Sequence, residues 1–380
     1  MIYLDNAATT WPKPEQVYQA MDNFMRNYGA NPGRAGHQMA NQAGKIIFTT
    51  RKLVARLFNA ASIQEIIFTA NATEALNLAI KGYLKPGEHL ITTSLAHNSI
   101  LRPVKELEKR GVEVSIIEAD RQGQIQAEKI KNAIRKNTKL VVMAHASNVT
   151  GTLLPIKEVG QLVADSEVKL LVDAAQTAGV YQIDVQKLGI DMLAFTGHKG
   201  LFGPQGTGGL YLKEGIELEP LIQGGTGSYS EDLNQPKLRP DLYESGTPNT
   251  VGIVGLKAGI EFVLAEGVDK IKEHDNDLVM YLQDQLKQIP EVTLYGAADL
   301  KQQVPLVAFN LGFENSGEIG YVLDKAFNIA VRTGLHCAPL VHKSLGTLEQ
   351  GIIRVSPSCF NTKEEIEEFI TAINEIAGEI

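Results

Sequence analysis

The sequence contains very little cysteine, with Cys337 and Cys359 as its two thiols among 380 residues. Two thiols cannot form a disulfide framework or a four-thiolate metal site, so we expect no metal centre. Scarce cysteine is typical of the reducing cytoplasm, and this is where we expect the protein to reside.

Long apolar runs and an excess of basic charge are also absent. No apolar run approaches the roughly 20 residues that span a bilayer, and the opening residues MIYLDNAATTWPKPEQ lack the segments of a signal peptide. The formal net charge is -8, and no cluster of lysine and arginine offers nucleic acid a basic stripe. The sequence therefore predicts neither a membrane protein nor a nucleic-acid-binding protein.

Seven short apolar runs alternate with segments of helical period between about residues 65 and 212. The runs read EIIFTA, EHLITTS, VEVSIIE, KLVVMAHAS, VKLLVDAA, DMLAFTG and GGLYL. In ATEALNLAIKGYL the apolar residues fall on one helical face, and Asn71 precedes it as a capping residue with Glu74 three positions on. Strands that alternate with helices predict an α/β fold with a mainly parallel seven-stranded sheet and helices on both faces.

A different pattern begins after about residue 255. We expect one long helix over residues 254–289, then strands and helices in an α+β arrangement with a last helix from about Thr362. Residues 223–250, rich in Gly, Ser and Pro, predict a loop before it. The expected domains are residues 15–255, and residues 1–14 together with 256–380.

Glycines follow Lys199 in the stretch TGHKGLFGPQGTGG. In a phosphate-binding P-loop the lysine follows the glycines and a helix comes next, whereas here the lysine comes first and a strand follows. The dinucleotide fingerprint G-x-G-x-x-G also fails, because it stands between a strand and a helix, whereas here a strand follows the glycines. The stretch therefore predicts a tight strand-to-strand connection whose glycines let the backbone approach a neighbour beside Lys199.

Polar residues follow four of the apolar runs, and ligands of open α/β sheets bind at the carboxyl ends of the strands. The residues are His97, Asn148, Asp173 and Lys199. Any one of them alone would suit a solvated loop end. Together they fit pyridoxal phosphate, whose chemistry needs a lysine amine, an acid at the ring nitrogen and a phosphate anchor.

Each of these residues has an expected role toward the cofactor. Lys199 supplies the amine that bonds to it, Asp173 keeps the ring nitrogen protonated, and His97 stacks on the ring. The phosphate is expected at the free N–H groups of the helix that starts at Ala72 and Thr73. Further polar contacts are expected from Asn148, Gln176, Thr196 and His198.

At these residues the sequence resembles the cysteine desulfurases and selenocysteine lyases, which are class V aminotransferase-like enzymes of PLP fold-type I. The likeness covers essentially the whole chain, in the motifs YLDNAATT, ATEALNLA, SNVTG, VDAAQTAG, TGHKGLFGPQGTGGLYL, YESGTPN, RTGLHCAP and IRVSPSCFNT. The piece RTGLHCAP is similar to the type II group with a short cysteine loop.

The resemblance implies conversion of L-cysteine to L-alanine, with a persulfide left on Cys337. Lys199, His97 and Cys337 would be the catalytic residues. It also implies a sulfur-acceptor partner, such as an iron–sulfur cluster assembly protein. A homodimer is implied as well, in which Gly246 and Thr247 reach the phosphate at the neighbouring subunit's site.

The two cysteines differ in their surroundings. Cys337 lies near residues that favour a reactive thiolate if they are cationic, namely Arg332, His336, His342 and Lys343. The alternative for Cys337 is a small buried residue in a turn. Cys359 is expected to fill the core.

Arg354, on an otherwise apolar strand, is expected to bind the substrate carboxylate with its planar fork of donors; the alternative is a structural ion pair. The other expected substrate contacts are Asn148, Asn6, Ala7, His37 and Arg332.

The sequence departs from the family pattern at Ala96, where Glu is frequent, and at Ala72, where Thr is frequent. The open alternatives are a selenocysteine lyase, a cysteine sulfinate desulfinase, a class V aminotransferase and a non-catalytic partner-binding homologue.

Overall fold

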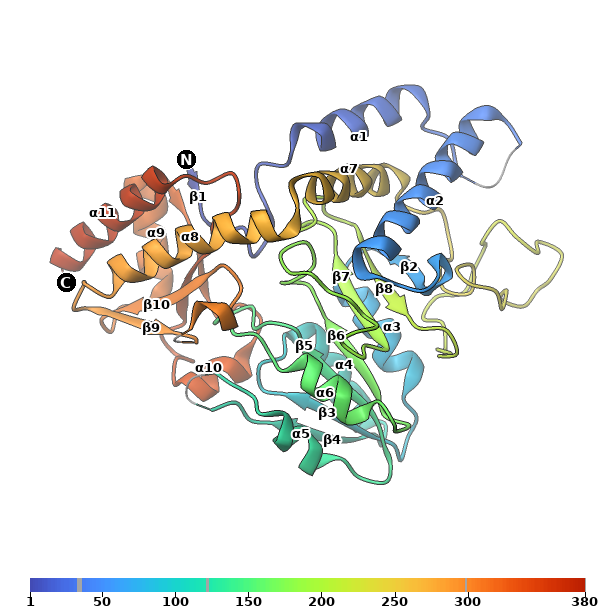
Figure 1. Ribbon diagram of the computed structural model, residues 1–380, viewed down its shortest axis with the longest axis horizontal. Helices are drawn as coiled ribbons and strands as arrows, with labels where there is room; N and C mark the ends of the chain where they lie inside the picture. Colours follow the sequence, from blue (N-terminus) through green and yellow to red (C-terminus); the bar gives the residue numbers. More distant parts are fainter. Residues whose placement is uncertain (33–35, 121–122, 298, 380) are drawn as a thin grey trace.

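The computed structural model describes residues 1–32, 36–120, 123–297 and 299–379. A larger part surrounds the central sheet, and a smaller part holds the C-terminal elements and the N-terminus (Figure 1). The chain therefore begins in the smaller part, builds the larger part, and returns.

The central sheet has seven strands in the order β2-β8-β7-β6-β5-β3-β4. Their bounds are β2 (Ile66–Thr69), β3 (His89–Thr93), β4 (Glu113–Ile117), β5 (Thr138–Ala144), β6 (Lys169–Asp173), β7 (Met192–Thr196) and β8 (Gly208–Leu212). β3 to β7 pair in parallel, and β8 runs antiparallel to both of its neighbours. The predicted mainly parallel sheet of seven strands is confirmed.

Helices cover both faces of this sheet. They are α2 (Gln38–Phe58), α3 (Ala72–Tyr83), α4 (Asn98–Lys109), α5 (Ala127–Ala133), α6 (Ile156–Val163) and α7 (Thr250–Glu266), and α1 (Glu15–Asn27) packs on the outside of α7 and α2. In β5, Val141 and Met143 belong to one core cluster with α2, α6 and α7, while Leu140 and Val142 belong to another with α3 and α4. Burial on both faces explains why the strands read as continuous apolar runs.

The smaller part contains an antiparallel sheet of order β12-β13-β10-β9 and a short parallel pair, β1 with β11. The strands are β1 (Ile2–Tyr3), β9 (Val292–Tyr295), β10 (Val307–Leu311), β11 (Ile329–Ala330), β12 (Arg332–Gly334) and β13 (Ile352–Val355). The helices are α8 (Val268–Leu286), α9 (Ser316–Phe327), α10 (Pro339–Leu345) and α11 (Lys363–Glu379). Ile2 and Leu4 share one hydrophobic cluster with Phe309 and Phe369. This shared core supports our proposed grouping of residues 1–14 with the C-terminal elements, whereas α7 continues past the proposed boundary at residue 255 and packs on the larger part through Leu256 and Ile260.

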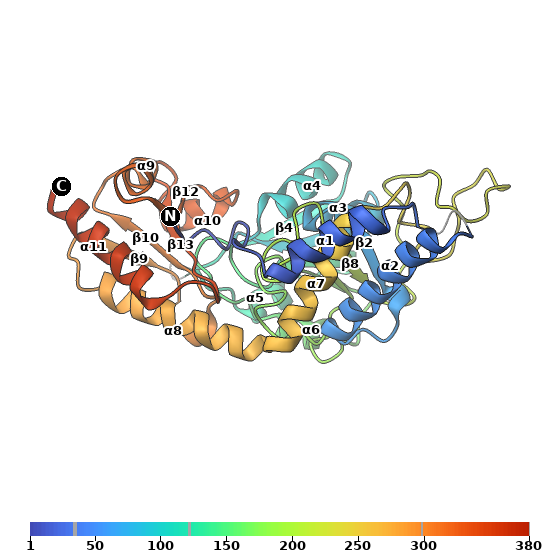
Figure 2. The same ribbon diagram turned by 90° about the horizontal axis from the view of Figure 1, so that it is seen from above.

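The single helix expected over residues 254–289 is wrong, because two helices, α7 and α8, occupy this stretch. Gly267 separates them with a φ of 88°, which lies in the left-handed region and interrupts helical hydrogen bonding. Figure 2 shows α8 leaving α7 in a new direction. This break carries the chain from the larger part to the smaller one.

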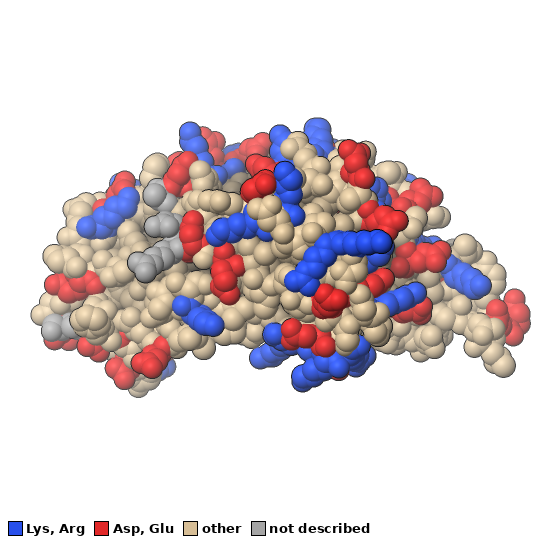
Figure 3. All heavy atoms as spheres, turned by 90° about the horizontal axis from the view of Figure 1, so that it is seen from below, with Lys and Arg blue, Asp and Glu red and all other residues tan. Residues whose placement is uncertain are grey.

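The loop predicted from residues 223–250 is confirmed up to α7, and it extends from the edge of the larger part (Figure 1). Acidic and basic side chains are interspersed on the face shown in Figure 3. In the ranges that the structure describes, no helix has the length and apolar character needed to cross a membrane.

Candidate active site

A cavity of about 460 Å³ lies between the larger and smaller parts of the chain. Its wall is formed by the ends of the central strands, the starts of α3 and α4, the N-terminal segment, and β12 and β13 with the loop that follows β12. The predicted site residues on its wall are Ala7, Ala72, Thr73, His97, Asn148, Asp173, Gln176, Thr196, His198, Lys199, Arg332, Cys337 and Arg354. The parallel arrangement of the strands thus brings together residues that are far apart in the sequence.

Lys199 stands in the turn after β7, and the N-terminal segment holds this turn in place. Thr10 Oγ1 donates to the carbonyl of Lys199 (3.1 Å), and Lys13 Nζ donates to the carbonyl of His198 (2.7 Å). Burial, followed by the charge of Arg354, lowers the pKa of Lys199 to about 8. At neutral pH a fraction of this amine is therefore uncharged. Thr10 and Lys13 were not predicted, because nothing in the local sequence pairs them with residues nearly 190 positions away.

The glycines after Lys199 allow close backbone contacts, as predicted. A Cβ on Gly200 would lie 2.6 Å from the carbonyl oxygen of Ala178, and a Cβ on Gly208 would lie 2.8 Å from Cα of Asn71. β7 and β8 are antiparallel neighbours. The glycine run is therefore the predicted strand-to-strand connection, and it packs the Lys199 turn and the start of α3 tightly.

The start of α3 presents backbone N–H groups to the cavity. Asn71 Oδ1 accepts from the N–H of Glu74 (2.9 Å), while the Glu74 carboxylate accepts from the N–H of Ala70 (2.6 Å). In the predicted capping box that carboxylate would accept from Asn71, so only half of the motif forms. The N–H groups of Ala72 and Thr73 stand in the first turn and have no acceptor within the helix.

His97 caps α4, and its protonation state follows from its contacts. Its Nδ1 accepts from the backbone N–H of Ser99 (3.0 Å) and contacts Ser99 Oγ (2.7 Å). Burial, followed by the charge of Lys199, lowers the pKa of His97 to about 4. The ring is therefore neutral at pH 7, with its proton on Nε2. Ser99 also contacts Thr73 Oγ1 (2.9 Å), so it links the two helix starts.

Asp173 and His198 present polar groups to the cavity at the ends of β6 and β7. Asp173 is buried, and its Oδ1 accepts from the N–H of Ala175 (2.9 Å). Burial raises the pKa of Asp173, so a cationic group beside it would stabilise its charged form. His198 Nδ1 is buried and has no hydrogen-bond partner within the described ranges. Both groups suit a polar ligand in this cavity.

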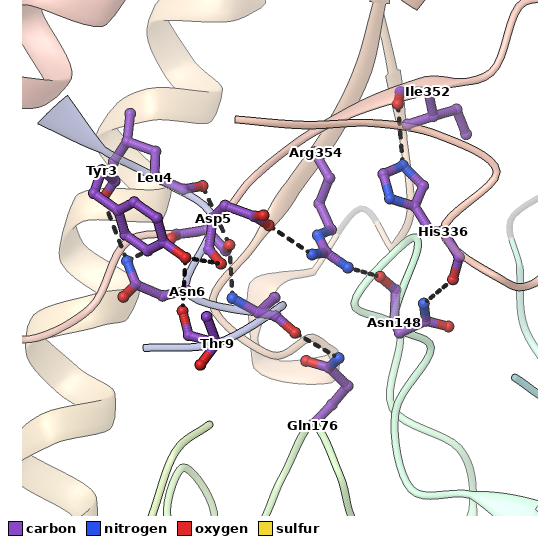
Figure 4. Close-up of polar contacts among 12 residues, drawn as sticks. Tyr3, Leu4, Asp5, Asn6, Thr9, Asn148, Gln176, His336, Ile352 and Arg354 are labelled. Carbon is purple, nitrogen blue, oxygen red and sulfur yellow. Dashed lines mark hydrogen bonds and ion pairs between the residues drawn. The ribbon is translucent and has the colours of Figure 1, made fainter. Parts of the chain in front are cut away.

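Arg354 is almost completely buried on β13, and Figure 4 shows its contacts. Its Nη1 donates to the backbone carbonyl of Asn148 (2.8 Å), and its Nη2 donates to Asp5 Oδ1 (2.9 Å). The ion pair that we gave as an alternative thus exists, although Arg354 also lines the cavity. Asp5 was not predicted, because its partner is 349 residues away in the sequence.

The amide side chains of Asn148 and Gln176 bridge the elements around Arg354. Asn148 Nδ2 donates to the carbonyl of His336 (2.7 Å), and Gln176 Nε2 donates to the carbonyl of Ala7 (3.1 Å) (Figure 4). These amides therefore connect the larger part to the cysteine loop and to the N-terminal segment.

Cys337 is exposed at the cavity, in the short turn between β12 and α10. His336 and Cys337 have φ values of 48° and 57°, and the carbonyl of Cys337 accepts from the N–H of Asn98 (2.8 Å). The turn is thus tied to α4 and leaves the thiol accessible. The alternative of a buried Cys337 is wrong.

The similarity of the chain to known proteins is extensive. It matches the aminotransferase class-V family over residues 2–369. The chain belongs to this class V aminotransferase family. It is 35% identical over 99% of its length to a cysteine desulfurase of Salmonella newport, 93% of which is covered. It is 36% identical, over 99% of its length, to a probable cysteine desulfurase of Methanothermobacter thermautotrophicus, of which 95% is covered.

Solved structures agree with these relatives of the class V chain. An apo cysteine desulfurase of Thermococcus onnurineus superposes with a TM-score of 0.93 at 36% identity, covering all of this chain and 95% of that one. The cysteine desulfurase CsdA of Escherichia coli superposes with a TM-score of 0.90 at 27% identity, with 100% and 95% covered. The resemblance drawn from the motifs and the expected fold-type I architecture are confirmed.

Two predicted substrate contacts of this class V enzyme lie outside the cavity. Asn6 is buried, and its Nδ2 donates to the carbonyl of Ser356 (3.0 Å), so it is a structural brace. His37 is exposed and caps α2, where its Nδ1 accepts from the N–H of Ala40 (3.3 Å). Within one chain neither residue therefore lies on the wall of this cavity, because sequence proximity to a motif does not fix where a side chain points.

The expected cationic surroundings of Cys337 need correction. His336 and His342 are buried. Burial lowers the pKa of His336 to about 3 and also lowers that of His342, so both rings are neutral at pH 7. Of the four nearby basic residues, Arg332 is the cation that shares the cavity wall with Cys337. Cys359 packs against a hydrophobic cluster, and burial raises its pKa to about 12, as expected for a core filler.

Gly246 and Thr247 also lie outside this cavity. Both are exposed, and they line a second cavity of about 280 Å³ with Thr69, Ala70 and Glu74. They approach the start of α3 from another side. Within one chain they therefore do not share the space beside Lys199.

Proposed function

We propose that this protein is a pyridoxal phosphate-dependent cysteine desulfurase that converts L-cysteine to L-alanine and holds the sulfur as a persulfide on Cys337. The observation that carries the proposal is one cavity wall shared by Lys199, Asp173, His97 and an exposed Cys337. The relatives named cysteine desulfurases support the same activity.

The residues present fit the cofactor. The N–H groups of Ala72 and Thr73 and the unpartnered Nδ1 of His198 would hold its phosphate end, with Thr196 beside them. Asp173 would pair with the ring nitrogen, and Lys199 would be the point of covalent attachment. When bound, pyridoxal phosphate supplies an electron sink for bonds broken at the substrate Cα.

The side chains of this protein perform the remaining tasks. The Lys199 amine, with its pKa lowered to about 8, accepts the proton from the substrate Cα. Arg354 binds the substrate carboxylate. The Cys337 thiolate attacks the substrate sulfur, so that an S–S bond forms and the C–S bond breaks, leaving its electron pair on carbon. His97 Nε2–H is the proton donor for that cleavage.

One assay separates this function from its alternatives. Wild-type protein should release L-alanine from L-cysteine, with sulfide appearing when reductant is added, and Cys337→Ser should lose this turnover while keeping the cofactor attached to Lys199. Cys359→Ser is the matched control and should keep full turnover, because that thiol lies outside the cavity.

Other outcomes would identify another enzyme. A Cys337→Ser variant that still turns over selenocysteine or cysteine sulfinate would indicate a lyase or desulfinase. Turnover that requires a keto acid and ignores Cys337 would indicate an aminotransferase. Absence of a borohydride-fixed adduct on Lys199 in mass spectra would contradict the whole proposal.

We also infer a homodimer with shared sites. Arg51 forms a two-pronged ion pair with Glu244 (2.6 and 2.8 Å), and Glu244 also accepts from the N–H of Phe68 (2.7 Å). These bonds fix the segment that exposes Gly246 and Thr247, which we propose reaches the phosphate at the partner subunit's site. Thr247→Val should weaken pyridoxal phosphate binding without dissociating the dimer in light scattering.

An exposed Cys337 persulfide also implies an acceptor protein, and an iron–sulfur assembly protein in the cytoplasm is our proposed recipient. The protein is first loaded with ³⁵S-cysteine and then incubated with a scaffold protein for cluster assembly. The label should transfer to that scaffold. Retention of all label on Cys337 would contradict this recipient.

A further inference from the structure

Asp5 lies on the cavity wall in a rigid position beside Arg354. The N–H of Asn6 donates to the carbonyl of Ser356 (3.1 Å), and the N–H of Ala8 donates to the carbonyl of Asp5 (3.0 Å). The Asp5 side chain is 15% exposed, and its Oδ1 lies 2.9 Å from Arg354 Nη2. The carboxylate is therefore a fixed neighbour of the proposed substrate-binding guanidinium.

Asp5 takes only part of the hydrogen-bonding capacity of Arg354. A guanidinium has five N–H donors. One goes to Asp5 and one to the backbone carbonyl of Asn148, and Nε has no partner within the described ranges. Because the bond to Asn148 does not involve Asp5, Arg354 keeps one anchor when the Asp5 charge is removed.

The charges around Asp5 are mostly positive. Arg332 pairs with Arg354 across the β12–β13 ladder, and both line the cavity together with Lys199. The charges that act on Asp5 come from Arg354, Arg332 and Lys199, and the phenol of Tyr3 also faces it. Among the described residues of the wall, Asp5 and Asp173 are the two acids, and Asp173 stands at the end of β6.

We propose that Asp5 acts as an internal competitor of the substrate carboxylate at Arg354. It neutralises the guanidinium while no substrate is bound, and it weakens the hold on the carboxylate of L-alanine so that the product leaves. This inference rests on the proposed function, because it assumes that Arg354 binds the amino-acid carboxylate.

The test uses cofactor-loaded protein and an Asp5→Asn variant, which keeps an oxygen acceptor and removes the charge. The inhibition constants of propionate and L-alanine against L-cysteine should each fall at least threefold, and the KM for L-cysteine should fall with them. Ethylamine, which has no carboxylate, should inhibit both proteins equally. Asp5→Glu, which restores the charge, should return the constants toward the wild-type values.

Asp22→Asn is the matched control, since Asp22 also pairs with an arginine (2.8 Å from Arg26) but is exposed on α1. It should leave every constant unchanged. Unchanged or weaker propionate binding in a cofactor-loaded Asp5→Asn protein would overturn the inference. Asp5→Ser gives the same test if the asparagine variant does not fold.

The two proposals fail in different ways. If the wild-type protein releases sulfide but Asp5→Asn binds propionate no more tightly than the wild type does, this inference alone is refuted. A wild-type protein that releases no sulfide refutes the proposed function, whatever propionate does.

Discussion

Gly208 provides a quantitative test of how the site is built. A Cβ added there would lie 2.7 Å from the carbonyl oxygen of Phe195 and 2.8 Å from both Cα and the carbonyl carbon of Asn71. Carbon atoms pack best at about 3.5–4.0 Å. All three neighbours are backbone atoms, so no side-chain rotation relieves the contact. In Gly208→Ala either β8 or the first turn of α3 must move.

Overpacking of this kind costs about 1–3 kcal/mol. The displaced turn carries the N–H groups proposed to bind the cofactor phosphate, so we expect the cost to appear in cofactor affinity. A loss of this size corresponds to about 5- to 150-fold weaker binding. Titration of the apoprotein with pyridoxal phosphate, followed by absorbance, measures the affinity, and urea unfolding of the apoprotein measures any general destabilisation.

Gly378→Ala is the matched control, because nothing lies within 4 Å of a Cβ at this position near the end of α11. It should be neutral or more stable by about 0.5–1 kcal/mol, as usual for Gly to Ala in a helix. A Gly208→Ala protein with wild-type affinity for pyridoxal phosphate and a wild-type urea midpoint would refute the packing argument.

Three further predictions concern buried and partly buried groups in and around the site. Lys13→Met removes the donor to the carbonyl before Lys199, so cofactor attachment to Lys199 should slow, as followed by absorbance, while the exposed Lys105→Met should not change it. Glu244→Gln and Arg51→Met should each lower the free energy of unfolding by about 3 kcal/mol, since each leaves one buried charge unpaired. If the double variant loses the sum of the two single losses, the two residues do not stabilise each other and the prediction is refuted. The free energy of unfolding should fall as the pH drops from about 6.5 to about 4, because the unfolded chain then binds protons that the native chain does not. Urea midpoints across this range check it. The histidines responsible are His97, His145, His198 and His336, with native pKa values of about 4 or lower, and they are opposed by the buried acids Asp5, Asp173 and Asp275, whose pKa values are raised. A midpoint that rises as the pH falls would contradict the neutral state of the histidines.

The sequence predicted the central sheet well because its signals are local. Each strand is a short apolar run, and helical period separates most of them. The carboxyl ends of parallel strands share one edge, so polar residues such as Asp173 and Lys199 were assigned to one site without knowledge of the strand order. The order of lysine and glycines was sufficient to exclude a nucleotide loop.

Local signals also had limits within the secondary structure. The apolar pattern continues across Gly267, and its φ of 88° depends on how the two parts of the chain pack, so the break between α7 and α8 was not predicted. Likewise, the capping acid Glu74 was recognised, although the N–H that it accepts from is that of Ala70.

Pairing and burial were decided by the tertiary structure. Asp5 meets Arg354, and Lys13 meets the Lys199 turn, only because β1 pairs with β11 and so places the N-terminal segment beside the C-terminal elements. His336 is close to Cys337 in sequence, yet burial keeps it neutral. Residue types and their spacing can be read directly from the sequence, whereas the desolvation and ion pairing of a group depend on which distant segments surround it. The sequence by itself therefore determined the kinds of chemical group at the site, and the fold determined their charges and partners.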